Sequence, residues 1–123
     1  MKFRKYPHLY QINALIFLRR LSEKHGRRLT LITIPEAEWQ HLKKSGVDLV
    51  WLMGVWHRSP AARLEALSDP QKRYEYIQTL PHWSDEDIVG SPYAIFNYQL
   101  HPELGAPNDL VRLRQKLKQG FQR

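Results

Sequence analysis

Side chains that could bind a ligand gather at two places in this sequence. An apolar run of strand length, residues 49–53, is followed at once by three large side chains: Trp56, His57 and Arg58. A Gly-Ser-Pro turn at 90–92 leads into a second aromatic stretch with Tyr93 and Tyr98. Loops just past the carboxyl ends of strands are where α/β folds keep their binding residues. The sequence therefore predicts a binding loop at Trp56, His57 and Arg58, whereas the pattern around Tyr93 alone favours a core or turn aromatic residue.

Catalytic and metal-binding patterns are missing from the same sequence. Glu36 and Glu38 fall in the first turn of an expected helix, where the helix dipole explains them. Residues 85–87 are an acidic segment with the spacing of a helix cap, and Asp48 precedes a strand and is expected to be solvated. The six histidines never recur at three- or four-residue spacing, and no nucleophile elbow, phosphate loop or dinucleotide fingerprint occurs. We expect no catalytic residue, no metal site and no cofactor within this chain.

Length and composition predict an ordinary soluble domain. The chain has 123 residues, of which 42% are hydrophobic and 25% charged, so one domain with a modest core is expected. It contains no cysteine, which excludes a disulfide framework, thiolate metal sites and a cysteine nucleophile. No apolar run could span a bilayer or form the core of a signal peptide. A cytoplasmic location, without a membrane partner, is the expectation.

The net charge of +7 is unevenly spread along the chain. Residues 1–28 carry a charge of +7, residues 29–111 a charge of −5 and residues 112–123 a charge of +5. Because both ends of the chain are basic, nucleic-acid binding stays open as an alternative function. A solvated helix face is the preferred interpretation for the basic residues at 19–28, because no aromatic residues are interleaved with them.

The elements that would position the aromatic residues form a strand–helix–strand unit. A short strand is predicted at residues 9–13. Asn13 is expected to cap a helix that spans residues 14–25 and ends at Gly26. Residues 30–34 are β-branched and suggest a strand or an extended loop. A second helix spans 35–44, and residues 49–53 form a strand parallel to the first. Because residues 49–53 do not alternate with polar ones, both faces of this strand are expected to be buried.

The second half of the sequence predicts helices separated by turns. Ser59-Pro60 and Asp69-Pro70 each begin a helical segment, and Ser84 begins the acidic cap. Residues 93–100 are expected to be extended. A final helix begins at 107–109, carries an apolar stripe and ends at Gly120. The stripe consists of Leu110, Leu113, Leu117 and Phe121.

These pieces occur in an order that resembles the start of the catalytic barrel of the α-amylase family, glycoside hydrolase family thirteen. The resemblance runs from about Pro7 to Phe121 and rests on 9–13, 47–56, Gly90-Ser91-Pro92-Tyr93 with Tyr98, and the helix at 109–119. It implies an α/β fold that is an incomplete (β/α)8 barrel. Its parts would be a first βαβ unit at 7–56, a long loop and helical excursion at 57–106, and a helix at 107–121.

The resemblance also implies roles for single residues. Tyr93 is similar to the tyrosine that stacks on the sugar next to the cleaved bond, Tyr98 would support it, and Trp56, His57 and Arg58 would shape the rim. The implied partner is an α-glucan or oligosaccharide. Two departures stand out, because Ala94 replaces an acid that the family often has there, and the chain stops at Arg123 before the family's Asp-x-x-x-Asn-His strand.

Retaining glycosidases need two carboxyl groups about 5 Å apart. In the family these come from later strands, so the chain is expected to be inactive alone, as a truncated product or one half completed by a complementary fragment. Two alternatives stay open beside it. One is a stand-alone module that docks on a partner through an open sheet edge or the final helix's stripe, and the other is the nucleic-acid binder.

Overall fold

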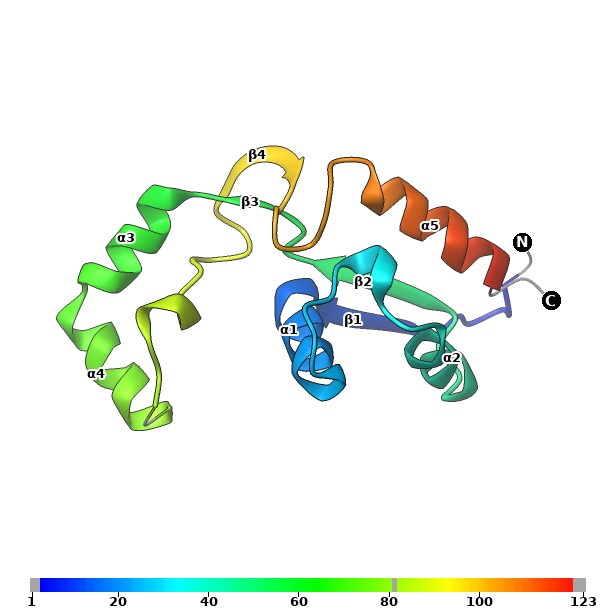
Figure 1. Cartoon of the computed structure of the whole chain (residues 1–123), viewed down its shortest axis with the longest axis horizontal. Helices are drawn as coiled ribbons and strands as arrows, with labels where there is room; N and C mark the ends of the chain where they lie inside the picture. Colours follow the sequence, from blue (N-terminus) through cyan, green and yellow to red (C-terminus); the bar gives the residue numbers. More distant parts are fainter. Residues whose placement is uncertain (1–2, 81, 121–123) are drawn as a thin grey trace. The chain divides into compact units, whose positions relative to one another are not determined.

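The computed structural model describes residues 3–80 and 82–120 of the chain (Figure 1). Within these residues the protein is a mixed α/β structure with five α-helices and two small sheets. The chain separates into two compact units, the first formed by 3–55 with 100–120 and the second by 56–99. The second unit falls almost entirely within the range 57–106 that the sequence assigns to an excursion.

A parallel strand pair forms the centre of the first unit. Strand β1, Leu9–Asn13, lies beside β2, Leu49–Met53, with Leu9 opposite Leu49 and Asn13 opposite Met53. Two helices connect them, α1 at Ala14–His25 and α2 at Glu36–Lys44. The predicted strand–helix–strand unit with parallel strands is confirmed.

Local chemistry sets the ends of α1 as the sequence predicts. The side chain of Asn13 accepts a hydrogen bond from the backbone N–H of Ile16 at 3.4 Å. At the other end Gly26 adopts a left-handed conformation with φ of 64°, and its N–H bonds back to the last helical turn. These two caps fix how the chain leaves β1 and turns toward α2.

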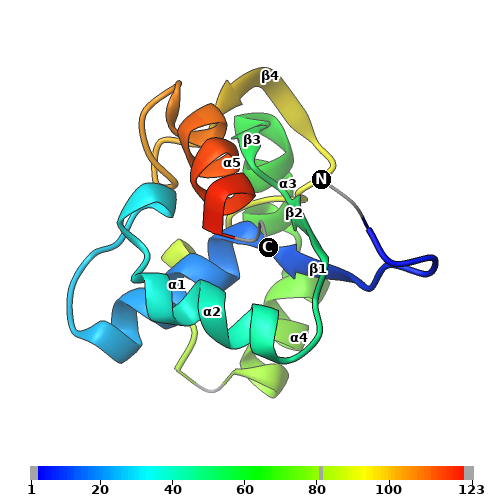
Figure 2. The ribbon, with the colours of Figure 1, turned by 90° about the vertical axis from the view of Figure 1, so that its right-hand side faces the viewer.

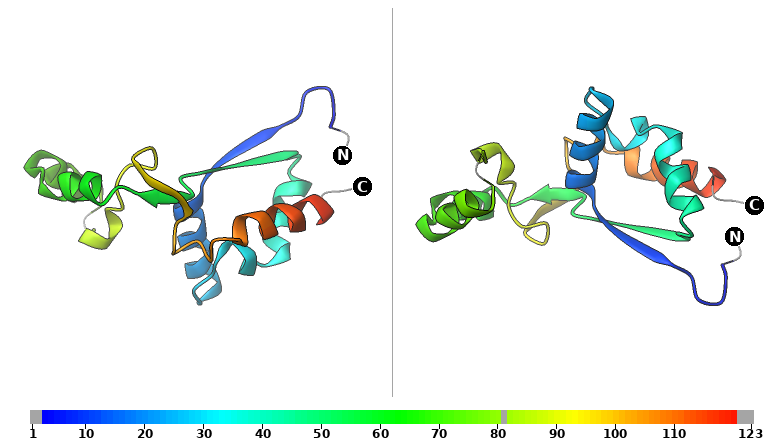
Figure 3. Two further views of the ribbon diagram at one scale, coloured as in Figure 1. Left: turned by 90° about the horizontal axis from the view of Figure 1, so that it is seen from above. Right: turned by 90° about the horizontal axis from the view of Figure 1, so that it is seen from below.

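The three helices of the first unit lie on one side of the β1–β2 pair, as Figures 2 and 3 show. The third is α5, Asp109–Gly120, which follows the segment from Leu100 onward. Every buried apolar residue of the described chain belongs to this unit, and the core on the helix side is built from Ile12, Ala14, Leu15, Leu18, Leu21, Leu29, Leu31, Ile34, Trp39, Val55, Leu100, Leu104 and Leu113. The core is thus one-sided.

The expectation that both faces of β2 are buried is wrong. No residue of β2 is fully buried, and Trp51 is 52% exposed. Side chains alternate along a strand, so Leu49 and Trp51 share a face with Leu9 of β1. No helix of the first unit covers that face, because α1, α2 and α5 all lie on the other side of the sheet (Figure 3).

Residues 30–34 form neither a strand nor a plain extended loop. They contain a short 3-10 helix, η1, at Leu31–Thr33. Thr30 and Thr33 satisfy each other locally, since the Thr30 N–H donates to the Thr33 hydroxyl at 2.8 Å. The β-branched residues here favoured a strand, but hydroxyl bonds to the local backbone and the burial of Leu31 decide the conformation.

The second unit consists of a small sheet and two helices. Strand β3, Trp56–Arg58, pairs with β4, Ile95–Leu100, and the helices are α3, Pro60–Ser68, and α4, Pro70–Thr79. A 3-10 turn, η2, covers Asp85–Asp87. The predicted helix starts at Ser59 and Asp69 are confirmed, because each side chain accepts backbone N–H groups of the following turn. None of the described residues in 56–99 is fully buried.

The final helix begins at Asp109, as the sequence predicts, and extends through Gly120. Of its predicted stripe, Leu113 is buried in the core, Leu110 and Leu117 are half-buried, and Phe121 lies outside the described residues. The helix is held at its start by Asp109, whose carboxylate accepts the Ala106 N–H at 2.8 Å. This carboxylate is itself buried.

Candidate functional site

All five residues that the sequence selects for ligand binding lie in the second unit. Trp56, His57 and Arg58 make up β3, Tyr98 lies on β4, and Tyr93 precedes β4. The flanking backbone bonds show that β3 and β4 are antiparallel. The residue after β3, Ser59, donates to the carbonyl of Ala94 before β4 at 2.7 Å, and His101 after β4 donates to Val55 before β3 at 2.8 Å.

The sheet brings Trp56 and Tyr98 together. Their rings meet edge to face, with centroids 5.8 Å apart and an interplanar angle of 74°. The Tyr98 side chain remains 77% exposed, so this contact braces the ring without covering it. Alternation along β3 places His57 on the opposite face of the strand from Trp56, where it is half-buried. His57 is therefore not part of the same aromatic surface.

Phe96 is an aromatic residue of this surface that sequence reasoning missed. It lies two residues before Tyr98 on β4 and is 65% exposed. The signal was present as an aromatic pair at alternate positions of an expected extended stretch. We define the aromatic surface as Trp56, Phe96 and Tyr98 on the sheet, together with Tyr93 at its start.

A tight turn presents Tyr93 to solvent. Its backbone N–H donates to the Ser91 hydroxyl at 3.2 Å, and the next N–H, of Ala94, donates to the Ser91 carbonyl at 3.1 Å. The Tyr93 side chain is 72% exposed. Because the backbone on both sides is tied down, the ring is held out from the turn rather than packed in a core.

Two arginines hold the loop that leads into this turn. Arg58 donates from Nη1 to the Gly90 carbonyl at 3.1 Å. Arg63 of α3 donates from Nε to the Ile88 carbonyl at 2.7 Å and from Nη2 to the Asp85 carbonyl at 3.0 Å. Guanidinium groups suit this because they offer several donors in a fixed fork. Arg58 thus has a structural role in positioning Tyr93, in addition to the rim role that the sequence suggests.

The acidic residues of the second unit that have visible partners serve as caps and ion pairs. Asp69 accepts the N–H groups of Gln71 and Lys72, and Asp87 accepts the N–H of Ser84 at 2.8 Å. Asp85 lies 3.6 Å from the Arg73 guanidinium. The predicted capping role of residues 85–87 is confirmed, and these groups do not converge on the aromatic surface in any described contact.

Three carboxylates of the first unit have a lowered pKa. A hydrogen bond from Lys24, helped by His25, lowers the pKa of Glu38, and the Arg19 guanidinium lowers the pKa of Glu103. The His8 backbone N–H and then Arg4 lower the pKa of Asp48, which binds Arg4 at 2.8 Å and is not simply solvated. A carboxyl group held ionised cannot donate a proton near neutral pH. These three groups stabilise structure.

Part of the basic head is neutralised within the fold. Arg19 forms a bidentate pair with Glu103, at 2.8 and 3.0 Å, and Lys24 pairs with Glu38. Arg4 is engaged by Asp48. The charge available to a polyanion from residues 4–28 is therefore smaller than the sequence count implies.

Within the part of the chain that the structure describes, no group of three or more His, Cys, Asp or Glu side chains lies close enough together to hold a metal ion. Nor does that part contain a helix with the length and apolarity needed to cross a membrane. Comparison of the chain with family profiles, with curated proteins and with solved structures gave no match.

Proposed function

We propose that this chain is the N-terminal portion of an α-amylase-type glycoside hydrolase that acts on α-glucan-type carbohydrates. Two features support the proposal. The parallel β1–β2 pair with its connecting helices is the unit from which a (β/α)8 barrel is built. The second feature, the aromatic surface of the other unit, is the main support for the proposal.

An aromatic surface of this kind suits a sugar. A pyranose ring presents a flat patch of C–H groups, which an exposed aromatic face can bind without ionic contacts. Tyr93, Phe96 and Tyr98 each leave most of their side chain in solvent, yet the backbone under them is tied by the β3–β4 sheet and the arginine bonds. Rings that are exposed and preorganised in this way lose little conformational freedom when a ligand binds.

The same proposal implies that the chain is inactive alone. Hydrolysis with retention needs a nucleophile and an acid about 5 Å apart. The carboxylates with described partners serve as caps or ion pairs, so the reactive pair would come from elsewhere in a complete enzyme. The purified chain is expected to release no reducing sugar from starch, maltooligosaccharides or an aryl glucoside, and turnover that survives rigorous purification would contradict this.

Sugar binding is testable without catalysis. Titration of the chain with maltohexaose, followed by NMR of the aromatic side chains, should shift the signals of Tyr93 and Tyr98 more than those of Tyr74, which is exposed on α4. Tyr93→Ala is expected to weaken binding at least about fivefold, or about 1 kcal/mol. Tyr74→Ala is the matched control and should leave it unchanged.

The result that would count against the proposal is equally specific. Equal shifts at Tyr74 and Tyr93, or equal affinity for maltohexaose and the β-linked cellohexaose, would mean that the aromatic surface is not an α-glucan site. A cytoplasmic location remains part of the proposal and rests on the sequence alone.

A protein-interaction module is the second candidate, and one observation favours it. Strand β2 has a strand neighbour only on the β1 side among the described residues. Open edges of this kind accept additional strands.

A further inference from the structure

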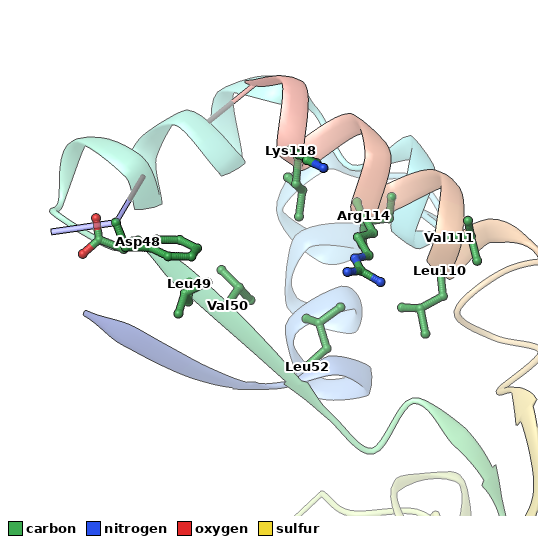
Figure 4. Close-up of a pocket in the computed structure, with 11 residues that line it drawn as sticks. Asp48, Leu49, Val50, Leu52, Leu110, Val111, Arg114 and Lys118 are labelled. Atoms are coloured by element: carbon green, nitrogen blue, oxygen red, sulfur yellow. The ribbon is translucent and has the colours of Figure 1, made fainter. Parts of the chain in front are cut away.

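A groove in the first unit runs between β2 and α5 (Figure 4). Its volume is about 670 Å³. Its apolar lining includes Val50 and Leu52 from the strand and Leu110 and Val111 from the helix. Arg114 and Lys118 of α5 add two cations to the lining. Figure 4 shows these two side chains on the side of the helix that looks toward β2.

The groove lies next to a strand edge whose backbone groups have no ladder partner in the described chain. β2 pairs with β1 alone, so its other edge presents N–H and C=O groups with no strand beside them. An extended chain matches the spacing of such groups, whereas a helix has already used its own N–H and C=O groups internally. The occupant that fits this groove is therefore a strand.

The helix beside β2 forms the other wall of the groove. In Figure 4 α5 runs along β2 in the opposite direction to the strand. A segment of another polypeptide can pair with the open edge of β2 in a parallel or an antiparallel sense. In either sense it can pack its side chains against α5 at the same time.

Charge fixes the chemistry of the occupant. Arg114 and Lys118 form no ion pair with any residue that the structure describes. The acid that lines the groove, Asp48, is already bound by Arg4 and His8. An apolar strand that carries a carboxylate would bury its apolar side chains between the walls and bring its charge to these two cations.

We propose that β2 and α5 form a docking site for an extended, apolar, carboxylate-bearing segment of another polypeptide, which adds to the β1–β2 sheet as a third strand. The inference does not depend on sugar binding by the second unit. The docking site is tested at residues 49–53 and 110–118, whereas sugar binding is tested at the aromatic surface. Failure of one proposal can therefore be told apart from failure of the other.

The experiment uses the full chain and a short capped peptide of alternating threonine and valine with a central aspartate. Binding is measured by fluorescence anisotropy of the labelled peptide, and hydrogen exchange reports the amides of residues 49–53. At a peptide concentration about ten times its Kd, exchange at these amides should slow about tenfold. A peptide with proline at alternate positions cannot form the ladder and should not bind.

Charge reversal tests the chemistry of the site. Arg114→Glu should raise the Kd of the aspartate peptide about tenfold, equivalent to 1.4 kcal/mol, and reverse the preference between it and a lysine-bearing peptide. Lys116→Glu is the control, because it makes the same charge change on α5 outside the groove lining. It should change the Kd less than about twofold. Val111→Asp, at an exposed groove position, provides a second variant that should weaken binding of the aspartate peptide.

Several results would overturn the proposal. They are unchanged exchange at 49–53, equal binding of the proline peptide, and equal effects of Arg114→Glu and Lys116→Glu. Protection of the same amides without peptide, in step with concentration-dependent dimerisation, would also overturn it, because the occupant would then be a second copy of this chain. All variants sit on exposed helix positions, and circular dichroism verifies that each is folded.

Discussion

The ion pair between Arg19 and Glu103 offers the sharpest test of how the first unit is held together. It joins α1 to the segment that follows β4, and two guanidinium nitrogens, Nε and Nη2, donate to the carboxylate at 2.8 and 3.0 Å. The Glu103 side chain is 30% exposed and that of Arg19 39% exposed. Glu103→Gln removes the charge and keeps the shape, so it isolates the ionic part of the contact.

The expected loss of stability at pH 7 is about 1 kcal/mol. Bidentate, charge-assisted bonds exceed ordinary surface pairs, which contribute about 0–1 kcal/mol, but partial exposure screens this one. With a urea m-value of about 2 kcal/mol/M, the midpoint should fall by about 0.5 M. Glu23→Gln, on the exposed face of the same helix, makes the same charge change and should shift the midpoint by less than half as much.

The pH dependence supplies a second readout. Because the folded pKa of Glu103 lies below its ordinary value of about 4.3, the contribution is fully present above that value. It is lost as the pH falls through the folded pKa and the carboxylate takes up a proton. The parent chain and Glu103→Gln should therefore converge in stability once the pH has fallen through the lowered folded pKa of Glu103.

A double-mutant cycle with Arg19→Met completes the test. A coupling energy close to the loss caused by Glu103→Gln alone would assign that loss to this pair. A coupling below about 0.3 kcal/mol, or a difference in stability between parent and Glu103→Gln that does not shrink as the pH is lowered into the acid range, would refute the reasoning.

Two further predictions use matched pairs of substitutions and thermal or urea unfolding. Gly105→Ala should destabilise the fold by about 2 kcal/mol, because φ at Gly105 is 146° and the new Cβ would meet Asp109 Oδ2 at 2.5 Å. Gly26→Ala should destabilise it by about 1 kcal/mol, because a Cβ there has no atom within 4 Å. Equal losses at the two positions would contradict this prediction. Leu15→Ala in the buried core should cost about 2–5 kcal/mol, whereas Leu64→Ala on the exposed face of α3 should cost less than about 0.5 kcal/mol. A large effect at Leu64 would mean that the second unit buries a core of its own.

Sequence patterns predicted the elements whose ends carry their own chemical signals. Asn13 and Gly26 mark α1, and the Ser59-Pro60 and Asp69-Pro70 pairs mark α3 and α4, because capping depends on side chains within a few residues. The parallel pairing of β1 with β2 also followed, since a connection through helices favours parallel strands.

Features that depend on distant packing were harder to obtain. The apolar run at 49–53 indicates how the strand could be buried, but not that all three helices of this unit lie on one side and leave Trp51 exposed. The sequence of residues 30–34 favoured an extended chain, but in the structure the hydroxyl of Thr33 accepts a hydrogen bond from the Thr30 backbone and the segment forms a 3-10 turn. In the candidate site, Trp56 and Tyr98 were selected in advance, whereas the structural bond of Arg58 to Gly90 depends on a loop conformation that no local pattern specifies.

The absence of a buried core in 56–99 bears on how the aromatic surface is kept in shape. Apolar burial supplies most folding free energy, yet the described residues of this unit bury no side chain fully. Backbone pairing of β3 with β4 and the arginine bonds to Gly90, Ile88 and Asp85 therefore take a larger share in ordering this unit than they would around a full core. Such bonds are directional, so they fix where the turn at Tyr93 sits while leaving the rings uncovered. A surface that binds through exposed aromatic rings needs both properties, since a conventional core at the same place would hide them.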